Sequence, residues 1–276
     1  LGLGNTTNRS SPVQVGTDTN WSSVSASAAH TLAIKTTGSL WGWGFNGSGR
    51  LGLGSNTTYN EFVMQVGTDT NWSSVSAGQV FTLAIKSTGS LWAWGYNTSG
   101  RLGLGDVVSR SSPVQVGTDT NWASVSAANA HTLAIKSTGS LWGWGFNSNG
   151  QLGLGDATAR SSPVQIGTDT NWSLVSASAA HTLAIKSTGS LWAWGLNGSG
   201  RLGLGDATAR SSPVQIGTDT NWSSVSTGSA QALAIKTTGS LWAWGNNANG
   251  TLGLGNTTVR SSPVQVGTDT NWSSVS

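Results

Sequence analysis

The sequence predicts an all-β fold, a β-propeller of four-stranded antiparallel blades with about 50 residues per blade. Three observations predict it: a tandem repeat through the whole chain, alternation of side chains within each repeat, and tryptophans at fixed repeat positions. Leu-Gly-Leu-Gly begins at residues 1, 51, 102, 152, 202 and 252, so we treat 1–276 as a single propeller domain. The repeats amount to five full units plus a half unit, an incomplete propeller, and we expect a longer chain to contain it.

Each repeat reads as four short strands separated by turns. In the first repeat we expect strands over 12–15, 22–26, 30–35 and 40–45. Side chains alternate in the last two segments, which places two tryptophans on one face of the last segment, opposite small glycines. Gly, Ser and Thr residues bound these segments, as turns require, and no segment has helical periodicity.

Every tryptophan occupies a position that recurs in other repeats. Six of the 16 end the hexapeptide Gly-Thr-Asp-Thr-Asn-Trp, and the other ten form pairs in Leu-Trp-(Gly/Ala)-Trp-Gly. Burying one Trp between blades removes roughly 150–250 Å² from water, worth about 4–6 kcal/mol as an upper bound. We therefore expect a structural role for the paired residues: Trp41, Trp43, Trp92, Trp94, Trp142, Trp144, Trp192, Trp194, Trp242 and Trp244.

The amino-acid composition excludes several classes of binding partner and site. Only 8% of residues are charged, the net charge is +3, and there is no run of Lys or Arg, so we expect no nucleic-acid partner. No apolar stretch is long enough to cross a membrane, so we expect no membrane insertion. Cysteine is absent, which excludes disulfides and thiolate metal sites. The low charge and abundant Ser, Thr and Asn favour a secreted or cell-surface bacterial protein, with the cytoplasm left open.

One known family has a similar repeat. The segments His30-Thr31-Leu32-Ala33-Ile34, Leu40 to Asn46 (Leu-Trp-Gly-Trp-Gly-Phe-Asn) and Gly49 to Gly54 (Gly-Arg-Leu-Gly-Leu-Gly) resemble the repeat of the regulator-of-chromosome-condensation family. The resemblance covers the whole chain and implies a propeller, usually of seven blades. It leaves function open, because members include exchange factors for a small GTPase, β-lactamase inhibitors, light sensors and scaffolds. The exchange factor carries a wedge inserted in one blade, whereas the longest insertion here is one residue.

The two expected loop faces differ in how much the copies vary. An antiparallel meander of strands A (22–26), B (30–35), C (40–45) and D (12–15) puts the A–B and C–D loops on one face and the B–C and D–A loops on the other. The B–C turn is nearly identical in five copies and the D–A loop is identical in six, which defines the constant face. The A–B turns, the residue after Trp-Gly and the C–D loop with the insertion differ, which defines the variable face.

We expect a binding surface on the variable face, because the variation introduces aromatic side chains there. An alternative is that recent duplication left drift wherever a turn tolerates it, and the two interpretations stay open. The candidate binding residues are Phe45, Tyr59, Glu61, Phe62, Gln79, Phe81, Tyr96, Phe146 and Leu196, of which Tyr59, Glu61 and Phe62 are expected in a C–D loop.

No catalytic residue, cofactor or metal site is predicted, and we expect no enzyme. His30, His131 and His181 recur at one strand position, which favours a structural, hydrogen-bonded role over a general base. Asp18 and Asn20 of the D–A loop supply one carboxylate, too few for Ca²⁺, so a turn role is favoured. The lysines that end strand B could form a positive ring, but solvated strand ends are favoured: Lys35, Lys86, Lys136, Lys186 and Lys236.

The leading functional hypothesis is a non-catalytic scaffold that binds a protein or ligand through the variable face. The first alternative is a structural protein that self-assembles through open blade ends, since unpaired sheet edges invite pairing. The second alternative is a guanine nucleotide exchange factor for a small GTPase, which the missing wedge disfavours. We therefore expect a protein partner or self-association.

Overall fold

A computed structural model describes all 276 residues and contains five antiparallel sheets of four strands each. Blade 1 comprises β1 (Trp21–Ala26), β2 (His30–Lys35), β3 (Leu40–Phe45) and β4 (Tyr59–Gln65). Blade 2 comprises β5 (Trp72–Ala77), β6 (Phe81–Lys86), β7 (Leu91–Gly95) and β8 (Arg110–Gln115). Blade 3 comprises β9 (Trp122–Ala127), β10 (His131–Lys136), β11 (Leu141–Gly145) and β12 (Arg160–Gln165). Blade 4 comprises β13 (Trp172–Ala177), β14 (His181–Lys186), β15 (Leu191–Gly195) and β16 (Arg210–Gln215), and blade 5 comprises β17 (Trp222–Thr227), β18 (Gln231–Lys236), β19 (Leu241–Gly245) and β20 (Arg260–Gln265).

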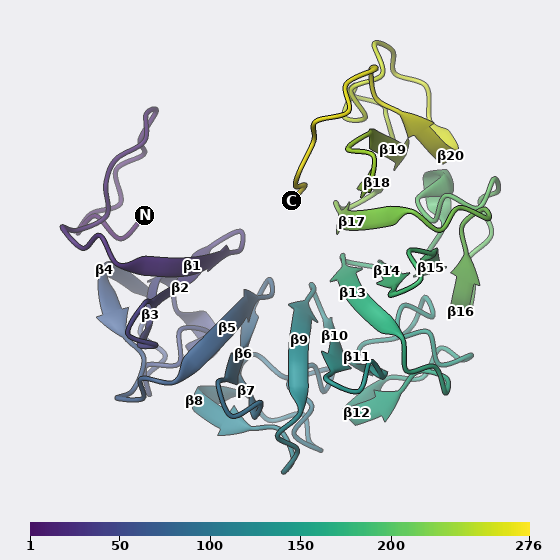
Figure 1. The fold of residues 1–276 in the computed structure, drawn as a ribbon. Coiled ribbons are helices and arrows are strands. Elements are labelled where there is room, and N and C mark those ends of the chain that lie inside the picture. Colours follow the sequence, from purple (N-terminus) through teal and green to yellow (C-terminus); the bar gives the residue numbers. More distant parts are fainter.

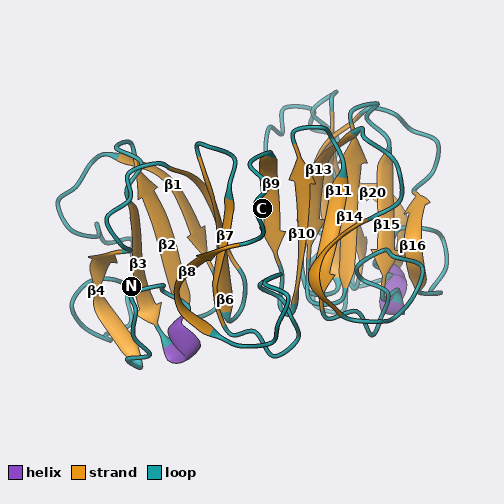
Figure 2. Cartoon of the chain, turned by 90° about the horizontal axis from the view of Figure 1, so that it is seen from below, coloured by secondary structure: helices purple, strands orange, loops and turns teal.

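The five blades form an open arc rather than a closed ring, with the two chain ends at the two ends of the arc (Figure 1). The first strand of each blade lies innermost, and the innermost strands of successive blades contact one another. Two short helical turns, η1 (Gly47–Gly49) and η2 (Gly198–Gly200), interrupt C–D loops and lie on the same side of the arc (Figure 2). The predicted all-β architecture of four-stranded blades is confirmed.

The strand boundaries differ from the prediction at the D strands. Residues 12–15 form no strand, because the structure has no strand C beside them. In blades 2–5 the D strand starts at the Arg three residues before the Pro at which we expected it to begin. In blade 1 the residues expected in a loop, Tyr59, Glu61 and Phe62, belong to β4. The sequence indicated the wrong start because Pro is typical of a first strand residue. In blade 2 the pairing of β7 with β8 continues through a β-bulge to Arg110, before the proline.

The core lies between blades. At the first junction blade 1 contributes Leu32 and Leu40, and blade 2 covers them with Trp72 and Trp94. The second Trp of each pair is the deeper one, between 0% and 8% exposed, whereas the first is partly exposed. Close packing also explains one glycine: a Cβ on Gly52 would lie 2.8 Å from the indole nitrogen of Trp94.

Hydrogen bonds repeat with the packing and tie each blade to the next. The Ala77 N–H donates to Ser25 Oγ at 2.9 Å, and the same bond recurs at the next three junctions. The carbonyl of Arg50 accepts from Thr82 Oγ1 at 2.8 Å and from Trp94 Nε1 at 3.0 Å. Because buried backbone carbonyls need partners, these bonds help to hold neighbouring blades together.

The two ends of the arc lack this cover. Val24 of blade 1 is 67% exposed, whereas its equivalents in the other blades are at least partly covered by the preceding blade. The first residues pack back on blade 1, where Leu3 bridges to Phe62 and Gly4 N–H donates to the Glu61 carbonyl at 2.9 Å. None of the helical turns is long and apolar enough to cross a membrane.

Candidate functional site

Hydrogen bonds assign the loops to two faces as expected. On the constant face the Trp72 N–H of the D–A loop donates to the Gly38 carbonyl in the B–C turn of the preceding blade. On the variable face the Arg50 guanidinium of a C–D loop donates to the Gln79 carbonyl in the A–B turn of the next blade, at 3.1 Å. The variable C–D loops and A–B turns therefore lie together on one face, and the constant D–A loops and B–C turns lie together on the other.

The constant face is held by a repeated cluster around each lysine. Lys136 Nζ lies 2.8 Å from Asp119 Oδ2 and 4.0 Å from the centroid of the Trp142 ring, and its side chain is 10% exposed. The other four lysines make the same contacts. The favoured interpretation of solvated strand ends was therefore wrong, because cation–π contact and an ion pair retain each ammonium group against the sheet.

One residue of the constant face explains why its loops do not vary. Gly139 has φ +78°, and a Cβ there would lie 2.1 Å from the Thr170 carbonyl oxygen. The D–A loop that holds Thr170 is also bound to the following blade through the Ser187 N–H, which donates to the Asn171 carbonyl at 2.7 Å. At each of the four junctions between blades the D–A loop is held between two B–C turns, which is a structural reason for its constant sequence.

The variable face presents one aromatic position per blade in the first three blades. Phe45, at the end of β3, packs on Tyr59 with ring centroids 5.2 Å apart. Tyr96 and Phe146 hold the equivalent position in blades 2 and 3 and are 37% and 38% exposed. In blade 4 the position is Leu196, which is half-buried. The candidates therefore follow the arc of blades rather than converge in one pocket.

The other candidates occupy three different settings. Gln79 is exposed at the tip of its A–B turn. Phe62 is 65% exposed, and Glu61 is half-buried beside it on the outer strand β4, away from the loop tips. Phe81 is 0% exposed and belongs to the core between blades 2 and 3, so its selection as a surface residue was wrong. Its position is the buried start of strand B, whereas we had grouped it with the neighbouring turn.

Arginines of the variable face were missed. Arg50 Cζ lies 4.6 Å from the Phe45 ring centroid, and Arg101 Cζ lies 5.2 Å from that of Tyr96. Arg101 and Arg201 repeat the bond to the next A–B turn, at 3.0 Å each. Burial lowers the pKa of all three guanidinium groups. The signal was available, since Arg precedes Leu-Gly-Leu-Gly at three junctions.

The three histidines are buried below the A–B turns. Ser27 Oγ lies 2.7 Å from His30 Nδ1, and Ser178 Oγ lies 2.6 Å from His181 Nδ1. His131 has Ala128 in place of that serine, and neither of its ring nitrogens has a partner. Burial, with a smaller effect of a nearby arginine, lowers the pKa of each histidine to about 3. Burial of all three is consistent with the expected structural role, but the expected hydrogen bond is missing at His131.

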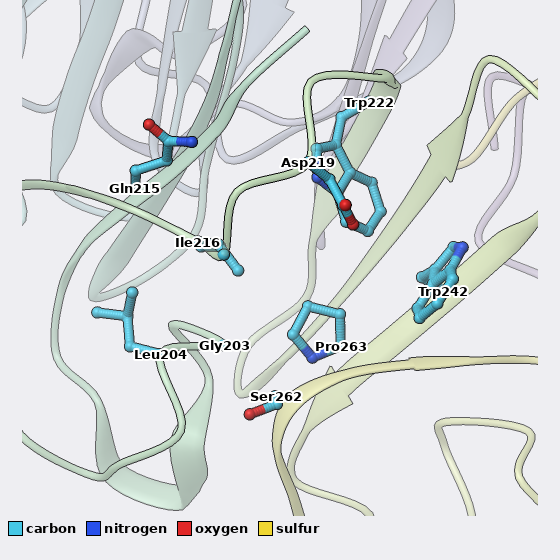
Figure 3. A pocket seen from close by; sticks show the side chains of 10 residues that line it. Gly203, Leu204, Gln215, Ile216, Asp219, Trp222, Trp242, Ser262 and Pro263 are labelled. Atoms are coloured by element: carbon cyan, nitrogen blue, oxygen red, sulfur yellow. The ribbon is translucent and has the colours of Figure 1, made fainter.

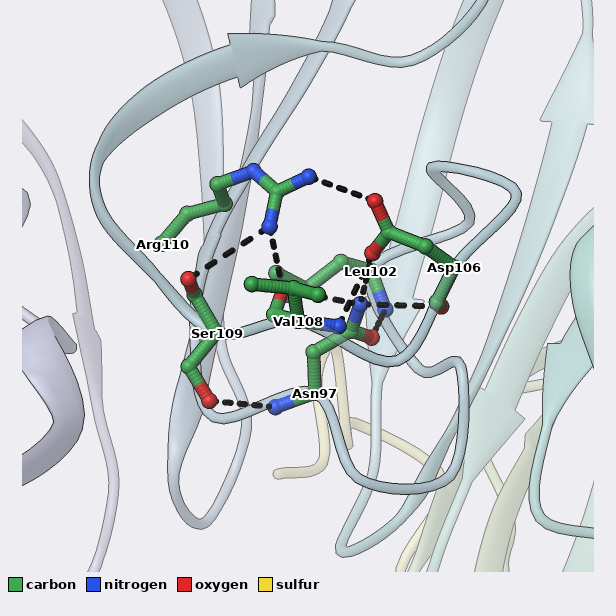
Figure 4. A network of polar contacts seen from close by, with 6 residues as sticks. All are labelled: Asn97, Leu102, Asp106, Val108, Ser109 and Arg110. Atoms are coloured by element: carbon green, nitrogen blue, oxygen red, sulfur yellow. Dashed lines mark hydrogen bonds and ion pairs between the residues drawn. The ribbon is translucent and has the colours of Figure 1, made fainter.

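A polar network stabilises each C–D loop of blades 2–4. In blade 2 Asp106 Oδ1 accepts from the Val108 N–H at 2.9 Å, and Oδ2 lies 2.6 Å from Arg110 Nη2 (Figure 4). The bond from Val108, with that from Arg110, lowers the pKa of the Asp106 carboxyl. Buried Asn97 joins this loop to the Leu102 N–H. The carboxylates are thus engaged in turns, and nowhere in the chain do three His, Cys, Asp or Glu side chains gather as metal ligands would.

Comparison with known proteins agrees with the repeat and the fold. Ultraviolet-B receptor UVR8 of Arabidopsis thaliana is 37% identical over 93 residues, which are 33% of this chain and 21% of that protein. Human protein RCC2 is 41% identical over 80 residues, 29% of this chain and 15% of RCC2. The matched stretches thus span about a fifth or less of each relative.

Solved structures match over most of the arc. Human WBSCR16 superposes with a TM-score of 0.82 at 24% identity, covering 94% of this chain and 70% of that one. Yeast RCC1 (Prp20), solved with Kap60 bound, superposes with a TM-score of 0.73 at 18% identity, covering 90% of this chain and 75% of that one. The family model described as RCC1-like domain matches residues 1–276, and the chain belongs to that family.

Proposed function

We propose that this protein is a non-catalytic scaffold whose variable face binds a protein partner or other ligand. The observation that carries the proposal is the arc of partly exposed aromatic side chains at one position of successive blades, Phe45, Tyr96 and Phe146. Aromatic residues supply much of the binding energy of protein interfaces. The family supports such a role, since yeast RCC1 was solved with Kap60 bound.

The contrast between the faces supports the same choice. The constant-face loops have bonds and packing that account for their identity, whereas the tips of the A–B turns, such as Gln79 and Ser229, are exposed. Arg50, Arg101 and Arg201 lie beside those tips and have no carboxylate partner within the chain. A partner surface with acidic groups and a flat apolar patch would complement them.

A site-specific cross-linker tests the proposal. A photoreactive phenylalanine analogue replaces Tyr96 in one chain and Ser137, exposed on the constant face, in a matched control chain. In extracts of the cells that make the protein, we expect one discrete adduct from position 96, abolished by excess unlabelled protein, and none from position 137. Absence of any adduct at 96, or equal adducts at both positions, would contradict the proposal.

A second candidate function is self-association through the open blade faces. The exposed Val24 and the partly exposed Trp21 favour it, since both would be covered by a preceding blade. Light scattering on the purified protein would then give a mass that rises with concentration. A constant monomeric mass would reject this candidate and leave the first untouched. Nucleotide exchange on a small GTPase has no observation of its own in its favour.

A further inference from the structure

A cavity recurs between neighbouring blades, where a D–A loop meets the next blade. Between blades 4 and 5 it has a volume of about 350 Å³, and between blades 3 and 4 about 340 Å³. The ten residues that line one cavity are identical in type to the ten that line the other. In Figure 3 Asp219 and Trp222 border one side, and Ser262 and Pro263 approach from the neighbouring β20 segment.

The same residues recur at the remaining two junctions. At the junction of blades 2 and 3 the ten positions carry the same residue types, except that Val116 replaces Ile216. At the junction of blades 1 and 2 the only difference is again a valine, Val66. The residues that form the cavity are therefore present at all four junctions, and the two cavities described have the size of small-molecule sites.

The cavity has an apolar floor. Trp222 is 4% exposed at its base, and the partly exposed Trp242 and Pro263 form the adjoining walls. Lys236 covers one face of Trp242, with Nζ 4.2 Å from the ring centroid. Aromatic rings carry a negative face that attracts polarised C–H groups of a ligand.

Polar groups at the rim offer both donors and acceptors. Asp219 uses Oδ2 for Lys236 at 2.7 Å, and the carboxylate remains 55% exposed. Gln215 is half-exposed and Ser262 exposed, so an amide and a hydroxyl are also available. Since Asp219 and Lys236 neutralise each other, the cavity offers no net charge to a ligand.

We propose that each of these cavities binds one ring of a neutral sugar, so that the row of cavities along the arc is a multivalent site for an oligosaccharide. A pyranose has C–H groups on its faces, which suit the indole and Pro263, and hydroxyls at its edge, which donate and accept. A polyproline segment presents only carbonyl acceptors, so it has no donor for the second oxygen of the Asp219 carboxylate, which Lys236 leaves free. The absence of net charge disfavours sulfated or phosphorylated ligands. None of the aromatic candidates of the variable face lines these cavities, so the proposal does not depend on the function proposed there.

Calorimetric titration of the intact protein tests this directly. The probes are cellotriose, chitotriose, maltotriose and mannotriose, with a sulfated disaccharide and a polyproline peptide as alternatives. We expect at least one neutral trisaccharide to bind at millimolar concentration with four equivalent sites per chain. A lone site would be weak, whereas a long polymer of the same sugar would bind more tightly because it engages several cavities at once.

Variants at one junction connect the binding to the cavity. Gln215→Ala combined with Ser262→Ala alters one cavity without touching the core, so we expect the stoichiometry to fall from four sites to three with the affinity of the rest unchanged. The control Ser229→Ala, on the variable face, keeps four sites. The proposal is overturned if none of the four trisaccharides binds, if only the sulfated sugar or the peptide binds, or if the double variant keeps four sites.

Discussion

The two loop faces of the arc are built from the same repeat but are held by different interactions. On the constant face every copy repeats the same ion pair, cation–π stack and inter-blade hydrogen bonds around its lysine, as at Lys136. On the variable face the bond from an arginine to the next A–B turn is present at three junctions, while Gln151 replaces that arginine at the fourth. Where the copies are identical, the loops are held by inter-blade contacts; where they vary, fewer contacts restrict the side chains, which is why we propose the binding surface there.

The largest expected effect comes from a glycine of the constant face. Gly139→Ala places a Cβ against the Thr170 carbonyl at positive φ, so we expect a loss of at least about 3 kcal/mol in the free energy of unfolding. Gly198→Ala, on the variable face, places a Cβ 3.7 Å from the Arg201 guanidinium, an ordinary van der Waals contact, and should cost under about 0.5 kcal/mol. Urea denaturation measures both. Equal losses of unfolding free energy in the two variants would contradict the tighter constraint on the constant face.

Removal of one ammonium group from the constant face should have the next largest effect. Lys136→Met keeps the apolar stem but loses the ion pair and the stack on Trp142, and we expect about 1–2 kcal/mol less stability. Asp119→Asn loses only the pair to a carboxylate that is 54% exposed, and should cost under about 1 kcal/mol. If the two variants lose the same amount in urea denaturation, the ring contact contributes nothing.

Acid should weaken the layer below the variable face. The folded-state pKa of each histidine, about 3, lies below the ordinary 6.5, so the unfolded chain binds more protons as the pH falls from 6.5 toward 3. Stability is therefore present above pH 6.5 and is lost across that window, by up to about 1.4 kcal/mol per pH unit for each histidine.

Copying a residue pair of blade 2 into blade 3 isolates the contribution of His131 to the pH dependence. His131→Phe with Ala128→Gly recreates the Gly78 and Phe81 pair of blade 2, where the glycine makes room for the ring. Between about pH 4.5 and 6, where carboxylates contribute little, the slope of unfolding free energy against pH should fall by about one third. An unchanged slope would mean that His131 titrates normally.

The smallest expected effect is a gain. Ala128→Ser supplies His131 Nδ1 with the partner that His30 and His181 already have, and should add about 1 kcal/mol. In the His131→Phe background no ring nitrogen remains to pair with the serine. Ala128→Ser should therefore add no stability there. A midpoint of urea denaturation that does not rise in the first variant would show that the buried ring has found another partner.

The sequence predicted the blades because each repeat carries its own signals. The segments 30–35 and 40–45 have the boundaries of β2 and β3, since alternation and the Gly turns between them are local. The environment of Phe81 was not predictable, because the next blade supplies Ala134 and Trp144 and nothing local reports which side that blade covers. The environment of Lys136 was not predictable for another reason: its contacts, Trp142 and Asp119, come from a paired strand and from the preceding D–A loop, and side-chain alternation alone does not show that they meet. The recurrence of Arg50 before Leu-Gly-Leu-Gly is visible in the sequence, but its partner, the Gln79 carbonyl, lies in the next repeat, so the contact was not predictable.

The most direct test of the central claim compares the two faces for affinity. Its ligand is the partner identified by cross-linking at position 96, and its variants are Tyr96→Ala with Phe146→Ala against Ser137→Ala with Ser187→Ala. The account predicts at least about tenfold weaker binding for the aromatic pair, no change for the serine pair, and unchanged urea midpoints for both. Equal affinities for the two double variants, or loss of binding only in the serine pair, would contradict the assignment of binding to the variable face.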